Sequence, residues 1–329
     1  MPAEWAPHER TWMAWPSADY TLGSDAQSAE LARQTWASVA NSIIRFEPVT
    51  MLVEASDYAL ARDYLDERVK LVEAELDDAW MRDTGPTFVK NSTGALAGVD
   101  WVFNGWGLQP WAKWGKDGRI AKFIDAELGL PNLESPLINE GGGFHVNGSG
   151  TILLTETVQL GVGRNSNWTK AEVEQELSRR LGTNRAIWFK RGLTRDYEEF
   201  GTRGHVDIVA CFADENTILY HDQQNPEHPD FLVSQEVRAT LEAAGDFKIV
   251  GVPAPKVLRD DSGWVDFSYI NHYLVAGAVI LCAFNDENDE LARDTLQAVH
   301  PDKEIVLVDA RALFERGGGI HCITQQQPR

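Results

Sequence analysis

Short apolar runs that predict β-strands alternate with stretches whose apolar residues recur at helical spacing, from one end of the chain to the other. Groups of strands with one helix follow each other at intervals of roughly 60 to 70 residues, and no Ser-, Gly- or Pro-rich linker separates them. We therefore expect residues 1–329 to form a single α/β domain, and the regular interval favours a cyclic array of similar units.

Helices are predicted at residues 28–46, 57–68, 116–128, 169–181, 231–243 and 289–299. Strands are predicted at residues 49–54, 69–76, 87–89, 151–155, 186–189, 202–212, 217–221, 248–252, 273–284 and 304–308. Residues 2–16, rich in Trp and Pro, are expected to be irregular. Residues 100–118 hold several tryptophans among glycines and are expected to form a long, functional loop.

The composition argues against several classes of protein. The 50 acidic residues outnumber the 30 basic ones and give a formal net charge of -20, so we expect no nucleic-acid partner, because nucleic-acid binding needs a basic face. Three cysteines in so long a chain favour a reducing compartment over a disulfide framework. The N-terminus lacks the pattern of a signal peptide, and the longest apolar run, residues 273–284, is too short to span a bilayer. A cytoplasmic protein without membrane contact is therefore expected.

The C-terminus carries the most distinctive local signal. Glycines at 317–319 lead into Ile320-His321-Cys322, and a polar run follows. Glycine allows a left-handed backbone or the close approach of another group. Cys322 is therefore either a thiol that a turn places for reaction or a buried cysteine of a last strand, where free cysteines are common. The flanking glycines and glutamines fit a core strand poorly.

Three further motifs lie at predicted strand ends or glycine turns, where functional sites are usually built. They are Trp80-Met81-Arg82-Asp83, Glu140-Gly141-Gly142 and Gly204-His205-Val206-Asp207. If residues 202–212 form a strand, the side chains of His205 and Asp207 lie on the same face and can contact one substrate side by side.

Together the motifs supply a thiol, an imidazole and several carboxylates. A Cys–His pair indicates nucleophilic catalysis, in which a thiolate attacks a carbon and the imidazole moves protons. Paired carboxylates suit a planar guanidinium cation, whose burial requires anions. A metal site is the competing hypothesis, but the spacings match no short ligand motif such as C-x-x-C, so no metal is expected. A binding module without catalysis would leave Cys322 dispensable.

These motifs, with Met1-Pro2-Ala3-Glu4-Trp5 and residues 12–16, resemble the agmatine deiminase / bacterial-type peptidylarginine deiminase family of the guanidino-modifying superfamily. The resemblance covers nearly the whole chain, and residues 318–328 are its most specific part. It implies a five-bladed, pseudo-symmetric α/β propeller (pentein) with the active site in its central channel, and neither cofactor nor metal. The implied reaction hydrolyses agmatine to N-carbamoylputrescine and ammonia through a covalent thiouronium on a cysteine.

The resemblance also implies roles for individual residues. Cys322 is the expected nucleophile, and His205 is the expected acid for the departing ammonia and then the base for water. Asp83 and Asp207 would hold the guanidinium, and Glu140 would orient His205. The candidate substrate-binding residues are Trp80, Asp83, Asp207 and Arg203. Arg82 is expected to be structural. His145, His221 and His321 are expected to be hydrogen-bonded within the fold or exposed to solvent.

Two segments depart from the family pattern: residues 17–23, and residues 200–203, which lack acidic side chains. Arg203 would repel the ammonium of agmatine if its side chain pointed inward. The alternatives are therefore deimination of free or peptidyl arginine or of a guanidino acid with a carboxylate tail, or amidino transfer to an amine. A small guanidino compound is the expected ligand, and a homodimer is the expected assembly.

Overall fold

The computed structural model describes residues 1–17 and 19–329. Residue 18, in the first of the two departing segments, lies outside the described residues. The helices are α1 (Asp19–Leu22), α2 (Ala26–Ile43), α3 (Tyr58–Tyr64), α4 (Met81–Thr84), α5 (Gly105–Leu108), α6 (Ile120–Leu128), α7 (Glu156–Gln159), α8 (Lys170–Leu181), α9 (Asp230–Ala244), α10 (Asp289–Val299) and α11 (Arg311–Phe314). The 3-10 turns used below are η3 (Gly141–Gly143) and η5 (Val206–Ile208).

The strands are β1 (His8–Ala14), β2 (Val49–Val53), β3 (Lys70–Glu73), β4 (Thr87–Lys90), β5 (Leu96–Val102), β6 (Asn132–Ile138), β7 (Phe144–Val146), β8 (Thr151–Thr155), β9 (Arg185–Phe189), β10 (Ala210–Asp214), β11 (Thr217–Asp222), β12 (Lys248–Pro253), β13 (Arg259–Asp260), β14 (Gly263–Trp264), β15 (Tyr273–Val275), β16 (Ala278–Ala283), β17 (Glu304–Asp309) and β18 (Gln325–Pro328).

The strands form small mixed sheets rather than one large sheet. Within the described residues, the sheet orders are β18-β1-β2-β3, β4-β5-β6, β7-β8-β9, β10-β11-β12 and β15-β16-β17, with the short hairpin β13-β14 in addition. Each three-stranded sheet pairs its first two strands antiparallel and its last two in parallel. The order β18-β1-β2 repeats this pattern. The fold is therefore α/β, and one unit of secondary structure recurs along the chain, as the sequence spacing predicted.

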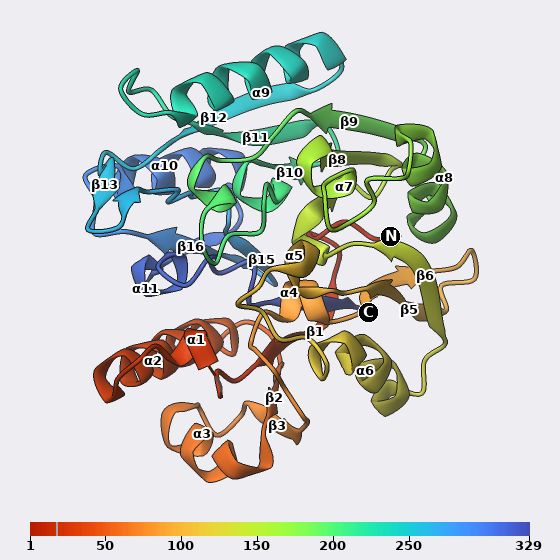
Figure 1. Ribbon diagram of the computed structural model, residues 1–329, viewed down its shortest axis with the longest axis vertical. Helices are drawn as coiled ribbons and strands as arrows, with labels where there is room; N and C mark the ends of the chain where they lie inside the picture. The colour runs from red at the N-terminus through yellow and green to blue at the C-terminus, as the bar shows by residue number, and fades with distance from the viewer. Residues whose placement is uncertain (18) are drawn as a thin grey trace.

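The long helices lie on the outside of the molecule, and the short helix α4 lies near its middle (Figure 1). Helix α8 shows why these stretches are helical: Thr169 and Glu172 form a capping box at its start, and Gly182 ends it in a left-handed conformation. Its buried residues, Val173, Leu177 and Leu181, belong to a core cluster with residues of the neighbouring sheets. A larger core joins residues from both ends of the chain, from Trp12 to Ile323.

The two ends of the chain meet in one sheet, because β18 pairs antiparallel with β1. Residues 2–16 were expected to be irregular, and no strand was predicted after residue 308; both expectations were wrong. Strand β18 consists of Gln325–Pro328, whose polar side chains give no hydrophobic periodicity. These glutamines are buried because their amides are used: Gln327 Oε1 accepts from Trp12 Nε1 at 2.9 Å, and Gln325 Nε2 donates to the Pro86 carbonyl at 2.6 Å.

Two predicted strands were also wrong in part. Residues 202–212 do not form one strand, because η5 and a turn precede β10. His205 and Asp207 therefore do not share a strand face, and the geometry that joins them has another origin. Residues 273–284 form two strands, β15 and β16, joined by a turn in which Gly277 has a φ of 82°.

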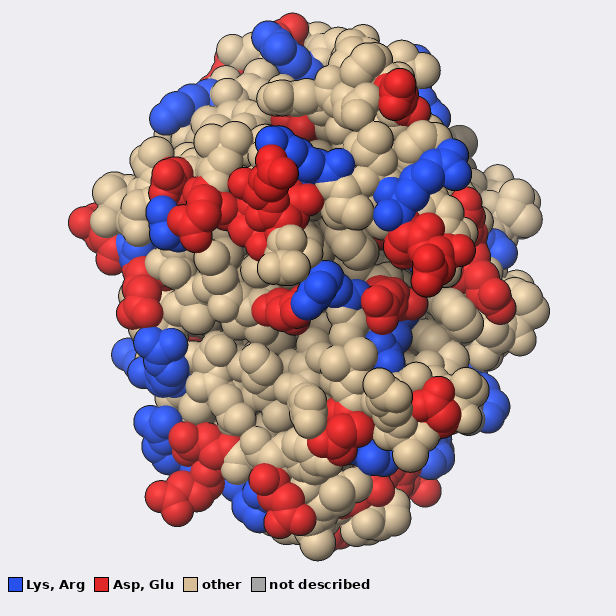
Figure 2. All heavy atoms as spheres, turned by 90° about the vertical axis from the view of Figure 1, so that its left-hand side faces the viewer, with Lys and Arg blue, Asp and Glu red and all other residues tan. Residues whose placement is uncertain are grey.

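On the face shown in Figure 2, acidic and basic side chains of the described residues are interspersed rather than collected into one basic patch. This distribution agrees with the net charge of -20. Among the residues that the structure describes, no helix has the length and apolar character needed to cross a membrane.

Candidate active site

Segments far apart in the sequence bring the five predicted catalytic side chains to one buried place. Asp83 lies in α4, near the middle of the molecule (Figure 1). Glu140 directly precedes η3, His205 directly precedes η5, and Asp207 lies within η5. Cys322 lies in the turn between α11 and β18, as the glycine pattern favoured. Each of these side chains belongs to a residue that is 5% exposed or less.

Hydrogen bonds between the turns fix their relative positions. The backbone N–H of Arg82 donates to the Cys322 carbonyl at 3.1 Å, which joins α4 to the C-terminal turn. The backbone N–H of Gly142 donates to Asp83 Oδ1 at 2.9 Å, which joins η3 to α4. Asn271 Nδ2 lies 3.2 Å from the carbonyl of Asp207. The site is thus held by backbone groups rather than by flexible side chains alone.

The Cys322 thiol lies among polar groups. Its Sγ is 3.3 Å from Asn271 Nδ2 and 3.5 Å from Asp207 Oδ2. A Cβ at Gly318 would lie 3.0 Å from this sulfur, so the glycine leaves space on one side of it. Burial raises the pKa of the Cys322 thiol well above its usual value, and the carboxylates of Asp207 and Asp83 raise it further. The thiol is therefore neutral in the free protein near pH 7.

The imidazole of His205 is surrounded by carboxylates. His205 Nε2 lies 3.4 Å from Glu140 Oε2, and Nδ1 lies 3.9 Å from Asp83 Oδ2. Burial lowers the pKa of His205, but Asp83, Glu140 and Asp207 outweigh it and raise the pKa to about 9. Within the described residues Nδ1 has no hydrogen-bond partner. His205 is thus an imidazolium at neutral pH with a ring N–H available to a ligand.

Glu140 is held in place by a buried arginine. Arg164 Nε donates to both carboxylate oxygens of Glu140 at 3.0 Å, and Arg164 Nη2 donates to the Thr202 carbonyl at 2.8 Å. Burial works to raise the pKa of Glu140, but Arg164 and then His205 hold it below its usual value. The Arg164–Glu140 pair therefore supplies a fixed anion next to His205.

Asp83 and Asp207 offer carboxylates toward the same space. A Cβ at Gly142 would lie 2.5 Å from His205 Nδ1 and 2.9 Å from Asp207 Oδ2, so only glycine leaves this space free. Asp83 Oδ2 accepts from Trp106 Nε1 at 2.8 Å, whereas Asp207 Oδ1 has no hydrogen-bond partner among the described residues. An acceptor that is buried and unpaired is suited to a cationic N–H donor.

Trp106 reaches Asp83 from a strained turn. The element labelled α5 in Figure 1 is left-handed, because Gly105, Trp106, Gly107 and Leu108 all have φ between 55° and 84°. A left-handed conformation costs a non-glycine residue about 1–2 kcal/mol. The Asn104 side chain stabilises the turn by accepting from the backbone N–H of Gly107 at 2.9 Å. Backbone strain of this kind is concentrated at functional sites.

The other two candidate substrate-binding residues differ in position. Trp80 lies beside the C-terminal turn: a Cβ at Gly318 would lie 2.6 Å from the Trp80 ring, and Trp80 Nε1 donates to Tyr20 Oη at 2.6 Å. Arg203 directs its guanidinium to the strained loop, where it donates to the carbonyl of Gly107 at 3.1 Å and to Gln109 Oε1 at 3.1 Å. These contacts engage the Arg203 guanidinium with protein acceptors.

Comparison with known proteins identifies the family of this chain. The family model of the Porphyromonas-type peptidyl-arginine deiminases matches residues 1–328. A Streptomyces coelicolor protein provisionally named agmatine deiminase is 55% identical over 335 residues, which cover 100% of this chain and 98% of that protein. The chain belongs to the agmatine deiminase / Porphyromonas-type peptidyl-arginine deiminase family. The agmatine deiminase of Stutzerimonas stutzeri is 37% identical, with 100% of this chain and 95% of that protein covered.

Solved structures of this family are similar over the full chain. The agmatine deiminase of Enterococcus faecalis, 30% identical, has a TM-score of 0.92 over 100% of this chain and 95% of that one. A Cys-to-Ser variant of the C. jejuni agmatine deiminase with substrate bound, 25% identical, has a TM-score of 0.90 over 100% of this chain and 96% of that one.

Several residues of this deiminase-family site were not predicted from the sequence. Asn271 stands in no glycine turn and no motif, so nothing in the sequence indicated it. Arg164 belongs to none of the predicted motifs, but it directly follows Gly161-Val162-Gly163, a glycine turn that could have indicated it. Trp106 had a signal, because it lies in the tryptophan-rich loop that was expected to be functional. Glu4 belongs to the opening motif, but the sequence assigned no role to it. His321 was expected only to be hydrogen-bonded within the fold or exposed to solvent.

Proposed function

We propose that this member of the family hydrolyses agmatine to N-carbamoylputrescine and ammonia. The observation that carries the proposal is the arrangement of Cys322, His205, Asp83 and Asp207: a thiol, an imidazolium and two carboxylates around a space that Gly142 leaves free. The agmatine deiminases among its relatives support the choice of agmatine. The negative net charge of -20 also favours a cationic substrate through long-range attraction.

In the first half-reaction, Asp83 and Asp207 bind the guanidinium, and Asp207 Oδ1 accepts one of its N–H groups. The Cys322 thiolate attacks the guanidinium carbon and forms a C–S bond. His205 donates its proton to one amino group as the C–N bond breaks, and ammonia leaves. The product of this step is an S-alkylthiouronium on Cys322.

In the second half-reaction, neutral His205 takes a proton from water, and the resulting hydroxide attacks the thiouronium carbon. The C–S bond then breaks, the electron pair returns to Cys322, and the hydroxyl proton of the intermediate passes to the sulfur as the carbonyl of the product forms, which restores the neutral thiol. N-carbamoylputrescine leaves, and His205 is again an imidazolium. Glu140 and Arg164 keep His205 in position throughout.

The Cys322 thiol is neutral in the free protein, so the attacking thiolate forms only on substrate binding. The pKa of Cys322 is raised by burial and by the anions Asp207 and Asp83. A bound guanidinium neutralises these carboxylates and places a positive charge near the sulfur, which lowers the pKa of the thiol. The thiolate therefore forms when the substrate is present, and its proton passes to solvent water before the C–S bond forms.

The recurring sheet unit supports the finer prediction of a five-bladed, pseudo-symmetric propeller that forms one deiminase domain over residues 1–329. In such a propeller the site would occupy the central channel, and the hydrogen bonds that join α4 to η3 and to the C-terminal turn support this placement. The cytoplasmic location, the homodimer, and the absence of a metal, a cofactor and a nucleic-acid partner stay predictions.

The direct test is ammonia release from agmatine, free arginine, 4-guanidinobutyrate and a blocked arginine peptide. We expect agmatine to give the highest kcat/KM of the four compounds, as the agmatine deiminases among the relatives of this chain suggest. Arg203→Gln should leave this preference unchanged, since the Arg203 guanidinium is bound to the carbonyl of Gly107 and to Gln109.

Other outcomes contradict the proposal in different ways. Faster turnover of a carboxylate-bearing compound would reject agmatine as substrate and identify Arg203 as a specificity residue. Release of putrescine without ammonia, when an amine acceptor is added, would indicate amidino transfer. No turnover of any compound would reject the deiminase function.

The pH dependence tests the protonation of His205. Because its pKa is about 9, the imidazolium is lost as pH rises through that value, and kcat/KM should fall above about pH 9. The raised pKa of His205 also contributes to the free energy of unfolding. This contribution is fully present below pH 6.5 and is lost as pH rises through about 9. In Glu140→Gln the pH above which kcat/KM falls should be lower by about one unit, because one anion beside the His205 ring is removed.

A matched control is Glu156→Gln, which removes an exposed glutamate paired with Lys170 at 2.6 Å. Its pH profile should equal that of the unchanged protein. A basic limb in Glu140→Gln that stays at the same pH would show that Glu140 does not set the pKa of His205.

A further inference from the structure

A line of buried charged groups connects Asp207 to the N-terminal segment. His321 Nδ1 lies 2.8 Å from Asp207 Oδ2, and His321 Nε2 lies 2.7 Å from Glu4 Oε1. The exposed fractions of these three residues are 6% or less. An imidazole ring can donate hydrogen bonds from both nitrogens only when both are protonated. A ring held between two carboxylates is therefore an imidazolium.

We propose that His321 and Glu4 are positioning residues, which keep Asp207 ionised and turn its free oxygen toward the guanidinium of the substrate. The inference deepens the proposed function and rests on it for the identity of the ligand. His321 engages Oδ2 of Asp207 and leaves Oδ1 without a partner among the described residues. Glu4 in turn fixes the ring and balances its charge.

A comparison of the two substrate carboxylates supports this role. Asp83 receives hydrogen bonds from neutral donors, Trp106 Nε1 and the backbone N–H of Gly142. Burial raises the pKa of Asp83, and no neighbouring cation fully offsets it. Burial also works to raise the pKa of Asp207, but the hydrogen bond from His321 reverses the shift and lowers it. The different partners account for the opposite shifts of two equally buried carboxylates.

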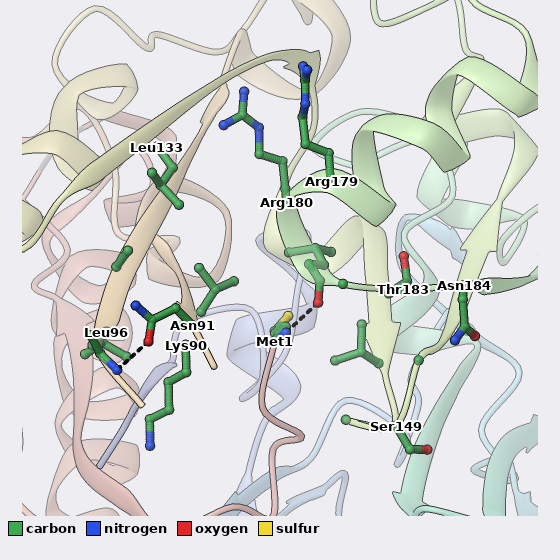
Figure 3. A pocket seen from close by; sticks show the side chains of 18 of the residues that line it. Met1, Lys90, Asn91, Leu96, Leu133, Ser149, Arg179, Arg180, Thr183 and Asn184 are labelled. Carbon is green, nitrogen blue, oxygen red and sulfur yellow. Dashed lines mark hydrogen bonds between the residues drawn. The ribbon is translucent and has the colours of Figure 1, made fainter. Parts of the chain in front are cut away.

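The far end of the line is anchored by the first residues of the chain. The amino group of Met1 donates to the Leu181 carbonyl at 2.5 Å, in a groove of about 740 Å³ between the β4–β5 hairpin and the end of α8 (Figure 3). Three residues later, the carbonyl of Glu4 lies 2.8 Å from His8 Nε2. The backbone on both sides of Glu4 is thus held, and its carboxylate has a defined position.

Other charged and titratable groups face this line from several elements. Those that act on Glu4 or on the ring of His321 are Asp207 in η5, Arg82 in α4, His145 in β7 and His272 directly before β15. Burial and Arg82 lower the pKa of His321, whereas Glu4 and the hydrogen bond to Asp207 raise it, and the net shift is upward.

Glu4, His145 and His321 also have the donor types of a metal site, and their ligand atoms lie within 4.8 Å of one another. Arg82 Nη1, however, lies 3.2 Å from Glu4 Oε1. The guanidinium already provides this carboxylate with a cation, and a metal ion would face its repulsion. The charge pattern therefore favours an ion-paired line over a metal centre.

The kinetic test is His321→Gln. Loss of the imidazolium raises the pKa of Asp207, so Asp207 takes up a proton at a higher pH during acidification. The acid limb of kcat/KM for agmatine should move up by about one pH unit, and KM should rise about tenfold, while kcat at the optimum changes less. Glu4→Gln keeps an acceptor for the ring but removes the charge, and should give a smaller shift in the same direction.

The matched control is His228→Gln. His228 is also a buried histidine, but its ring contacts the Val265 carbonyl and the backbone N–H of Asp230, and within the described residues it makes no hydrogen bond to Asp207, Glu4 or His321. Its acid limb and KM should therefore be unchanged. If His321→Gln lowers thermal stability but leaves the acid limb and KM as they are, His321 is only a structural residue and the proposal is overturned.

A second measurement needs no substrate, so it separates failure of this inference from failure of the proposed function. In protein labelled with ¹⁵N at the eight histidines, His321 is assigned by its absence from the His321→Gln spectrum. We expect ring ¹⁵N shifts of a doubly protonated imidazolium at pH 7, where an unperturbed histidine is mostly neutral. A neutral tautomer at pH 7 would overturn the inference, whatever compound the enzyme turns over.

Discussion

Cys322→Ser is expected to lower agmatine turnover by at least about four orders of magnitude while leaving agmatine binding within a few-fold of its original value. A serine hydroxyl is a far weaker nucleophile than a thiolate. Its pKa is so high that a bound cation cannot lower it enough for the hydroxyl to ionise near neutral pH. The carboxylates of Asp83 and Asp207 remain, so the guanidinium is still held. Ammonia release measures the first effect, and calorimetric titration of the variant with agmatine measures the second.

Cys211→Ser is the matched control, because Cys211 is also a buried free cysteine but belongs to β10. It should retain turnover. Acid quenching of the unchanged enzyme during turnover should trap a mass increase on the peptide that contains Cys322. Ammonia release from Cys322→Ser at a rate near that of the unchanged enzyme would reject covalent catalysis by this residue.

The turns that carry the chemistry could be predicted because their signals are local. The glycines before Cys322, and the three glycines after Glu140, mark places where the backbone or a ligand comes close. The structure shows the reason at Gly142 and Gly318, where any Cβ would enter the space next to His205 or Cys322. Amphipathic helices such as α10 were also predictable, with bounds of 289–299.

What could not be predicted depends on partners distant in sequence. Strand β18 is polar, and the burial of its glutamines is explained by pairing with β1 and by hydrogen bonds of their amides to Trp12, Arg82 and the Pro86 carbonyl. Arg164 becomes a site residue because folding places it against Glu140, 24 residues away. His321 stands next to Cys322, but its partner Glu4 lies 317 residues away. Such buried polar pairs leave no periodic pattern of apolar residues in the sequence.

His205 and Asp207 lie beside the same space next to Gly142, but not through the strand that the sequence predicted. A strand was expected to place both side chains on one face. In the structure a 3-10 turn carries Asp207, and the contacts of each residue are set by different neighbours: Glu140 for His205, and His321 for Asp207. The chemistry requires the two groups to face one ligand, and more than one backbone path satisfies that requirement.

Gly142→Ala is expected to lower kcat/KM for agmatine by about three orders of magnitude, although it adds only one methyl group. The added carbon would lie 2.5 Å from His205 Nδ1 and 2.9 Å from Asp207 Oδ2. Neither side chain can yield easily, since Glu140 holds the one and His321 the other. Misplacement of catalytic groups by about 1 Å costs about 100-fold, and here the methyl group also excludes the substrate.

Gly143→Ala, in the same turn, is the matched control. Its added carbon would lie 3.0 Å from Val158 Cγ1 and 3.1 Å from Asn139 Oδ1, away from His205 and Asp207. Small shifts of these neighbours relieve the contact, so kcat/KM should stay within about threefold, although the thermal midpoint falls slightly. Circular dichroism and thermal unfolding establish that both variants are folded. If folded Gly142→Ala retains more than a tenth of the original kcat/KM, the substrate does not occupy the space between His205 and Asp207, and the proposed binding mode is wrong.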